Sequence, residues 1–275
     1  MKTLELENDA VKQNVRERYG QIAEQGGGCG CAPTCCSPSG AVVPDDHDVA
    51  TVSQGLGYSA EETSAAPAGS NLGLGCGNPQ AIAALQPGET VLDLGSGAGF
   101  DAFLAARAVG PAGRVIGVDM TPAMVSKARK NQVNGGFENI EFHLGEIENL
   151  PVADASVNVI ISNCVINLSP DKGRVFREAF RVLQPGGRLA ISDVVALAPI
   201  PEALRQDWEL YTGCVAGASL VDDLRKLLLE AGFADIRIVR KGESREIIGA
   251  WFPGRKAEDY VAGASIEAVK PVIKP

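Results

Sequence analysis

From residue 80 onward, short apolar runs alternate with amphipathic stretches that carry helix start and stop signals. The runs that we interpret as strands are TVLDLG (90–95), RVIGVD (114–119), IEFHLG (140–145), VNVIIS (157–162) and GRLAISDVV (187–195). Helices are predicted between them: one that Gly110 closes, one from Pro122 to about Asn134, and one with Ser169 as its cap and Pro170 at its first position. This alternation predicts an α/β fold, with a mostly parallel sheet and helices on both faces.

The pattern is different on both sides of this region. Residues 8–24 have helical periodicity, and GGGCGCAPTCCSPSG then begins an irregular polar stretch that continues to about residue 70. After the last strand we expect an insertion, a helix over 219–232 that ends at Gly232, a final strand pair within DIRIVRKGESREIIGAWFP, and a tail. The predicted division is therefore an N-terminal helix and cysteine-rich arm (1–70), a core (71–195), and an insertion with a C-terminal region (196–275).

Composition and charge exclude several classes of function. The chain has 275 residues and a formal net charge of −9, and no stripe of Lys and Arg interrupts that acidic balance, so no nucleic-acid partner is expected. No apolar stretch reaches the roughly 18 residues of a membrane span, and the charged start is unlike a signal peptide. We expect a cytoplasmic protein with no membrane contact, for which a monomer suffices. In that compartment the seven cysteines are expected to be reduced, which favours catalytic or ligand-binding roles.

The segment VLDLGSGAGFD places Gly95, Gly97 and Gly99 on a turn between a strand and a helix. Glycine at such a turn lets the backbone approach a ligand closely and exposes N–H groups at the helix start. The dinucleotide fingerprint needs Gly or Ala where this chain has Phe100, so the loop departs from it. Asp93 is better suited to an ammonium group than to a pyrophosphate, and Asp119, at the end of the next strand, can accept both hydroxyls of a ribose.

Together these residues resemble the class I S-adenosylmethionine-dependent methyltransferases, which have a Rossmann-like fold. The resemblance spans residues 71 to about 252, and a nucleotide-binding α/β domain of another kind is the alternative. It implies that S-adenosylmethionine is the cofactor and places Glu146 and Ile147 around the adenine. The cofactor-binding residues that follow are Asp93, Gly95, Ser96, Gly97, Gly99, Asp119, Met120, Glu146, Ile147 and Asn163.

Three cysteines outside the arm suggest the acceptor. Cys76 lies in NLGLGCGNP, Cys164 in ISNCVINLSPDK at the end of a predicted strand, and Cys214 in YTGCVAGA within the insertion. A thiol is a poor general base for an alcohol but an excellent ligand for a soft, thiophilic centre. Two alternatives are ordinary packing, which is common for free cysteines, and zinc binding, whose usual paired spacings are absent here.

These three motifs, with ESREIIGAWFPG and AEDYVAGASIEAVKP near the end of the chain, resemble those of the arsenite methyltransferases. The resemblance implies arsenic detoxification, with trivalent arsenic, from arsenite or a thiol conjugate, held by Cys164 and Cys214. Cys76 is then the third ligand or a redox partner. Arsenic's lone pair is the nucleophile, so no general base is needed, and a dithiol returns the two electrons that each methylation withdraws.

The disulfide formed in that step would be reduced by a glutathione or thioredoxin-type system. Among the arm's Cys29, Cys31, Cys35 and Cys36, we favour Cys36 as the partner of Cys76 and include it among the catalytic residues, although Cys35 cannot be told apart from it by sequence. Two other functions stay open: a methyltransferase of an ordinary small-molecule carbon, nitrogen or oxygen acceptor, and a non-enzymatic metalloid or zinc sensor. Cofactor binding would exclude the sensor, and transfer that survives thiol blocking would indicate an ordinary acceptor.

Overall fold

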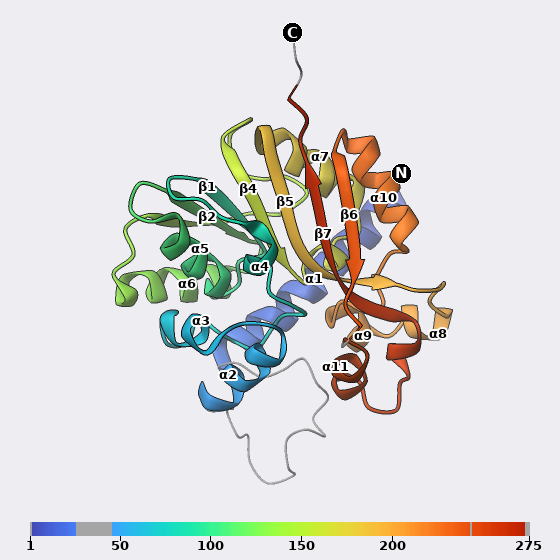
Figure 1. The fold of residues 1–275 in the computed structure, drawn as a ribbon. Helices are drawn as coiled ribbons and strands as arrows, with labels where there is room; N and C mark the ends of the chain where they lie inside the picture. The colour runs from blue at the N-terminus through green and yellow to red at the C-terminus, as the bar shows by residue number, and fades with distance from the viewer. Residues whose placement is uncertain (1, 26–45, 243, 273–275) are drawn as a thin grey trace.

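A computed structural model describes residues 2–25, 46–242 and 244–272 (Figure 1). Its strands are β1 (Thr90–Leu94), β2 (Arg114–Asp119), β3 (Ile140–Leu144), β4 (Val157–Asn163), β5 (Leu183–Ala196), β6 (Ala234–Arg240) and β7 (Val261–Val269). They form a seven-stranded sheet in the order β3-β2-β1-β4-β5-β7-β6. Strands β1 to β5 are parallel, and β7 is antiparallel to both of its neighbours. The predicted α/β fold with a mostly parallel sheet is therefore confirmed.

The helices are α1 (Lys2–Gln25), α2 (Asp46–Gly55), α3 (Ala60–Ala65), α4 (Gln80–Ala83), α5 (Phe100–Val109), α6 (Pro122–Gly135), α7 (Lys172–Val182), α8 (Glu202–Arg205), α9 (Trp208–Thr212), α10 (Val221–Ala231) and α11 (Ser244–Trp251). Short 3₁₀ turns cover Ile166–Leu168 and Ala257–Asp259. Across the part of the chain that the structure describes, no helix is both long and apolar enough to cross a bilayer.

Alternating strand residues build a core on each face of the sheet. Leu92, Ile116 and Ile160 face α7 and α10, whereas their neighbours Val91, Val115 and Val159 face α4, α5 and α6. These strand residues are at most 5% exposed, so both faces are covered, which explains why the central strands read as continuous apolar runs rather than as alternating ones.

The carboxyl ends of the parallel strands lie at one edge of the sheet, at the bottom of Figure 1. There α1, drawn in blue, crosses the sheet, and α2, α3, α9 and α11 surround the same edge. In an open α/β sheet, ligands bind in the crevice outside this edge. The elements that follow and precede the core therefore gather where a site is expected.

Several predicted elements need correction. Residues up to 70 were expected to be irregular after the first helix, yet α2 and α3 lie there; Ser59 and Glu62 form a capping box that starts α3. Helix α7 begins after Asp171, whose side chain accepts from Arg174 N at 2.9 Å, so Ser169 is not its cap. The final strand pair is β6 with β7, because residues 244–251 form α11.

Candidate active site

A cavity of about 510 Å³ lies at this edge of the sheet. Its wall includes the ends of β1 and β4, the turn after β1, Lys12, Val15 and Tyr19 from α1, and a face of α11. Helix α1 thus covers this edge of the sheet. The Tyr19 hydroxyl donates to Thr212 O at 3.1 Å, beside the segment that follows α9 and carries Cys214. Of the residues predicted to bind the cofactor, those in the wall are Asp93, Gly95, Ser96, Gly97, Asp119, Met120, Ile147 and Asn163.

The glycine loop leaves β1 in a left-handed conformation that glycine alone adopts readily. The φ angles of Gly95, Gly97 and Gly99 are 67°, 52° and 99°. A Cβ at Gly95 would collide with the side chain of Val165, so the loop also depends on the absence of a side chain there. The predicted role of Gly99 in cofactor binding stays a prediction. Gly99 is the N-cap of α5, packs under Phe103, and is not part of the cavity wall.

Two polar atoms beside this loop, Asp93 Oδ2 and Ser96 Oγ, have no hydrogen-bond partner among the residues that the structure describes. Asp93 is 2% exposed, and burial, followed by the charges of Asp101 and Asp119, raises the pKa of its carboxyl well above the usual value. An unpaired buried carboxylate is costly unless a ligand cation or donor reaches it. Asp93 therefore offers an acceptor for a ligand ammonium group, and its contact with the methionine end of S-adenosylmethionine stays a prediction.

Asp119 fixes the loop to the end of β2. Its Oδ2 accepts from Gly97 N at 3.0 Å and its Oδ1 accepts from Thr121 N at 2.8 Å. Burial raises the pKa of the Asp119 carboxyl, and the two backbone donors oppose that rise. Each carboxylate oxygen keeps a second lone pair. The side chain can therefore still accept ribose hydroxyls from the cavity side.

The predicted adenine contact at Glu146 stays a prediction. Glu146 binds Lys12 at 2.7 Å and also Arg16, both from α1, and it lies outside the cavity wall. Partial burial alone would raise the pKa of Glu146, but the hydrogen bond and charge of Lys12, together with Arg16, lower it. Ile147 lines the cavity, and Glu148, which sequence reasoning missed, lines it too.

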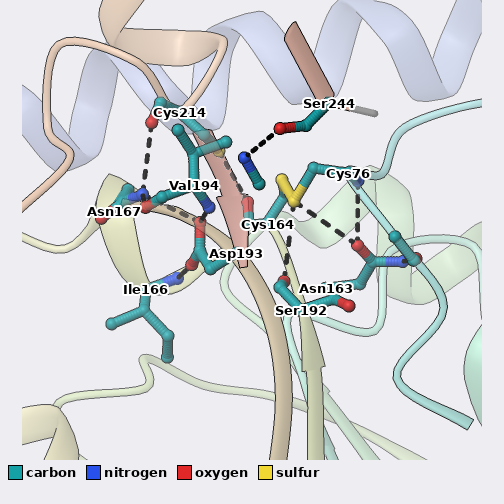
Figure 2. Close-up of a disulfide and its surroundings, with 12 residues drawn as sticks. Cys76, Asn163, Cys164, Ile166, Asn167, Ser192, Asp193, Val194, Cys214 and Ser244 are labelled. Atoms are coloured by element: carbon teal, nitrogen blue, oxygen red, sulfur yellow. Dashed lines mark hydrogen bonds between the residues drawn. A yellow bond between two sulfur atoms is a disulfide. The ribbon is translucent and has the colours of Figure 1, made fainter. Parts of the chain in front are cut away.

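The three cysteines outside the arm come together beside the cavity (Figure 2). Cys76 and Cys164 are joined by a disulfide, with 5.8 Å between their Cα atoms. Cys214 forms no disulfide within the described residues. It is 3% exposed, and its Sγ donates to Cys164 O at 2.7 Å. Cys164 and Cys214 line the cavity, whereas Cys76 is buried behind them.

The disulfide bears on two expectations. The cysteines were expected to be reduced, and Cys76 was expected to pair with an arm cysteine, preferably Cys36. The fold instead places Cys164 within bonding distance of Cys76, at the end of β4. Cys29, Cys31, Cys35 and Cys36 lie outside the described residues, so their roles stay predictions.

The backbone at two of these cysteines is in the left-handed region that favours glycine. The φ angle is 55° at Cys164 and 64° at Cys214. A buried hydrogen-bond network connects the two segments. Asn167 Nδ2 donates to Asp193 Oδ1 at 2.9 Å and to Cys214 O at 3.2 Å, and Asp193 Oδ2 accepts from Ile166 N at 3.0 Å (Figure 2).

The electrostatics of this cluster oppose spontaneous ionisation of Cys214. Burial, and then the charge of Asp193, raises the pKa of the Cys214 thiol well above its usual value, while Lys172 partly offsets the rise. Asp193 Oδ lies within 4.8 Å of both disulfide sulfurs. The thiol of Cys214 is therefore protonated in the free protein at neutral pH, and a thiophilic ligand must displace its proton.

A second network was missed because it depends on residues in the stretch predicted to be irregular. The Tyr58 hydroxyl donates to Asp101 Oδ1 at 2.8 Å, and Asn163 Nδ2 donates to Asp101 Oδ2 at 3.2 Å. Burial raises the pKa of Asp101 to about 6, despite these donors. All three residues line the cavity. Asp101 follows the glycine loop by two positions, which was the one sequence signal for it.

Comparison with known proteins identifies the family. Residues 85–232 match the methyltransferase domain family. The chain is 55% identical over 264 residues to an arsenite methyltransferase of Halobacterium salinarum, covering 96% of this chain and 67% of that protein. It is 40% identical to the human arsenite methyltransferase, over 54% of this chain and 42% of that protein.

A solved structure agrees with these relatives. The arsenic(III) S-adenosylmethionine methyltransferase from Chlamydomonas reinhardtii superposes with a TM-score of 0.59 at 35% identity, covering 85% of this chain and 75% of that one. The chain spans less than half the length of the human relative and two thirds of the archaeal one. By its sequence, its fold and its converging cysteines, the chain belongs to the arsenite methyltransferase family.

Proposed function

We propose that this chain transfers a methyl group from S-adenosylmethionine to trivalent arsenic held by Cys76, Cys164 and Cys214. The observation that carries the proposal is that three cysteines from distant segments come together beside one cavity. Cys164 and Cys214 line the cavity that also contains Asp93 and Asp119, and Cys76 is bonded to Cys164. Thiolates bind soft metal and metalloid centres strongly, and they bind carbon, nitrogen or oxygen acceptors weakly. An acceptor site built from thiols therefore fits arsenic better than carbon, nitrogen or oxygen.

S-adenosylmethionine, when bound, supplies an electrophilic methyl group on a sulfonium centre. The residues of the chain contribute by binding and orienting the two reactants. Asp93 and Ser96 offer the unpaired oxygens for the methionine end, and Asp119 offers acceptors for the ribose. Cys164 and Cys214 face the same cavity, so an arsenic atom on their sulfurs would share that cavity with the methyl donor. Holding two reactants in contact removes much of the entropic barrier.

Arsenic requires no general base, because its lone pair would attack the methyl carbon directly, while the carbon–sulfur bond of the sulfonium breaks and S-adenosylhomocysteine leaves. Formation of the As–C bond formally raises arsenic from the trivalent to the pentavalent state, so two electrons must return. Two cysteine thiolates supply them by forming one disulfide. The Cys76–Cys164 disulfide has the composition of that product, which supports the proposal.

A new cycle then needs an external reductant. We propose a thiol system of the glutathione or thioredoxin type, which transfers two electrons to the disulfide and frees both ligands. The substrate enters as arsenite or as a thiol conjugate of trivalent arsenic, and each new arsenic–sulfur bond releases water or the conjugated thiol.

The test is turnover by the reduced chain with S-adenosylmethionine, arsenite and glutathione, with arsenic species separated by chromatography and detected by mass spectrometry. We expect methylated arsenic from the unaltered chain and none from Cys164→Ser. If Cys164→Ser methylates arsenite as fast as the unaltered chain, the proposal is wrong. Methyl transfer to an organic acceptor that persists after thiol alkylation would instead indicate an ordinary small-molecule methyltransferase.

A further inference from the structure

The segment that carries Cys76 has no regular secondary structure to fix it. Residues 75–77 read Gly-Cys-Gly and lie between α3 and α4. The side chain of Asn163, at the end of β4, contacts this segment twice: its Oδ1 accepts from Cys76 N at 3.0 Å, and its Nδ2 donates to Gly77 O at 2.7 Å. Asn163 and Cys76 lie side by side in Figure 2.

These two contacts define the orientation of the amide group. A backbone N–H only donates and a carbonyl only accepts, so Oδ1 must face Cys76 and Nδ2 must face Gly77. The second Nδ2 hydrogen is shared between the Tyr58 hydroxyl at 2.9 Å and Asp101 Oδ2 at 3.2 Å. Both donors of the Asn163 amide are therefore engaged by protein groups, although the residue lines the cavity and was predicted to bind the cofactor.

The flanking glycines show how closely the segment is enclosed. A Cβ at Gly75 would lie 2.8 Å from Asn163 Nδ2. On the other side, a Cβ at Gly77 would lie 2.6 Å from Ser192 Oγ and would collide with the end of Lys241. The sulfur of Cys76 also lies 3.6 Å from Ser192 O and 3.9 Å from Asn163 Oδ1. The peptide is thus held between β4 and β5.

We propose that Asn163 is a positioning residue that holds Cys76 within reach of Cys164, and that its main role is not cofactor binding. Asn163 immediately precedes Cys164 in the chain. The end of β4 therefore carries Cys164 directly, and it also fixes the backbone of Cys76 through the Asn163 side chain. The role of the paired thiols rests on the proposed function, whereas the positioning itself is a property of the disulfide and is testable without arsenic.

The test measures the equilibrium of the Cys76–Cys164 pair with glutathione. In the full chain, Cys214 and the four arm cysteines are replaced by serine, and the disulfide fraction is measured by alkylation and mass spectrometry across glutathione ratios. We expect Asn163→Leu, which is similar in size but lacks both contacts, to lower the equilibrium constant for disulfide formation about tenfold, since two hydrogen bonds of about 0.5–1.5 kcal/mol each are lost.

The matched control is Asn158→Leu. Asn158 lies on the same strand, and its Oδ1 accepts from Thr90 N at 2.8 Å, far from the cysteines. We expect it to lower the melting temperature without changing the disulfide equilibrium. An equilibrium constant for Asn163→Leu within twofold of the parent would overturn the proposal, as would an equal fall in Asn158→Leu.

A second variant keeps the test valid if Asn163→Leu does not fold. Gly75→Ala introduces a methyl group against Asn163 and should also weaken the disulfide, whereas the same change in an Asn163→Ala background should cost much less, because the obstructing amide is gone. Additive effects of the two changes would contradict the arrangement.

The affinity for S-adenosylhomocysteine separates positioning from cofactor binding. By calorimetry we expect Asn163→Leu to weaken this binding by a smaller factor than it weakens the disulfide equilibrium. A loss greater than tenfold, with the disulfide equilibrium unchanged, would make Asn163 a cofactor ligand and overturn the inference. If arsenite were not methylated at all, the proposed function would fail while the disulfide result stood.

Discussion

Replacing Asp93 with asparagine should have opposite effects on the free protein and on its complex with cofactor. The change keeps the size of the side chain but removes the negative charge. In the free protein, burial raises the pKa of this carboxyl, so ionisation at neutral pH is costly. Asp93→Asn should therefore increase the free energy of unfolding in the absence of ligand, as measured by urea titration at pH 7.5.

In the complex the same carboxylate has an ammonium partner. A hydrogen bond to a charged group contributes about 1.5–3 kcal/mol, so its loss should weaken S-adenosylhomocysteine binding by about 10-fold to 150-fold. This estimate assumes that the ammonium group binds Asp93 Oδ2, which has no hydrogen-bond partner among the described residues. Isothermal calorimetry measures the affinity directly, and Asp223→Asn, an exposed change of the same charge on α10, is the control.

The pH dependence of the cofactor affinity tests whether the ionised form of Asp93 is the form that binds. Since the ammonium group binds the ionised carboxylate, the affinity of the unaltered chain should increase as pH rises through the elevated pKa of Asp93, and the Asp93→Asn variant should show a smaller increase. An Asp93→Asn variant that binds S-adenosylhomocysteine within threefold of the unaltered chain would refute the assignment of this pocket to the methionine end.

Three other predictions follow from the site. The pKa of Asp101 is raised to about 6, so the folded state binds its proton more tightly than the unfolded state does. Asp101 should thus reduce the free energy of unfolding by up to about 3 kcal/mol as pH rises from about 4 to about 6, and Asp101→Asn should flatten that fall in urea titrations. Gly95→Ala forces a side chain onto φ 67° and into Val165, so S-adenosylhomocysteine affinity should fall at least tenfold, with partial recovery when Val165 is also alanine; full affinity in the single variant would contradict the close approach. Glutathione should form its mixed disulfide at Cys164, which lines the cavity, and not at the buried Cys76; peptide mapping after rapid alkylation decides between them.

Local sequence patterns predicted the helices and strands whose conformation depends on residues close together in the chain. The buried run Val157–Ile161 indicated β4, and Gly110 and Gly232 ended their helices as expected, because such signals act over a few residues. Residues 244–251 show the limit of this approach. A short apolar run there is compatible with a strand or a helix, and packing against the rest of the molecule, not its own sequence, makes it α11.

Site residues at the carboxyl end of a strand could be predicted from the sequence, whereas those that depend on long-range contacts could not. Asp93 and Asp119 follow from strand ends, and the cysteine motifs indicated thiol chemistry. The partner of Cys76 did not follow, because no local signal says which of several thiols the fold brings nearest. Tyr58 and the ion pairs that engage Glu146 were missed for the same reason: their partners lie scores of residues away.

The left-handed backbone at Cys164 and Cys214 has a consequence for evolution and engineering at these two positions. For a residue with a side chain, this conformation costs on the order of 1 kcal/mol, and glycine avoids that cost. A mutation to glycine at either position relieves backbone strain while it deletes a sulfur. Selection for a more stable fold would therefore favour loss of these thiols unless the chain uses their sulfurs.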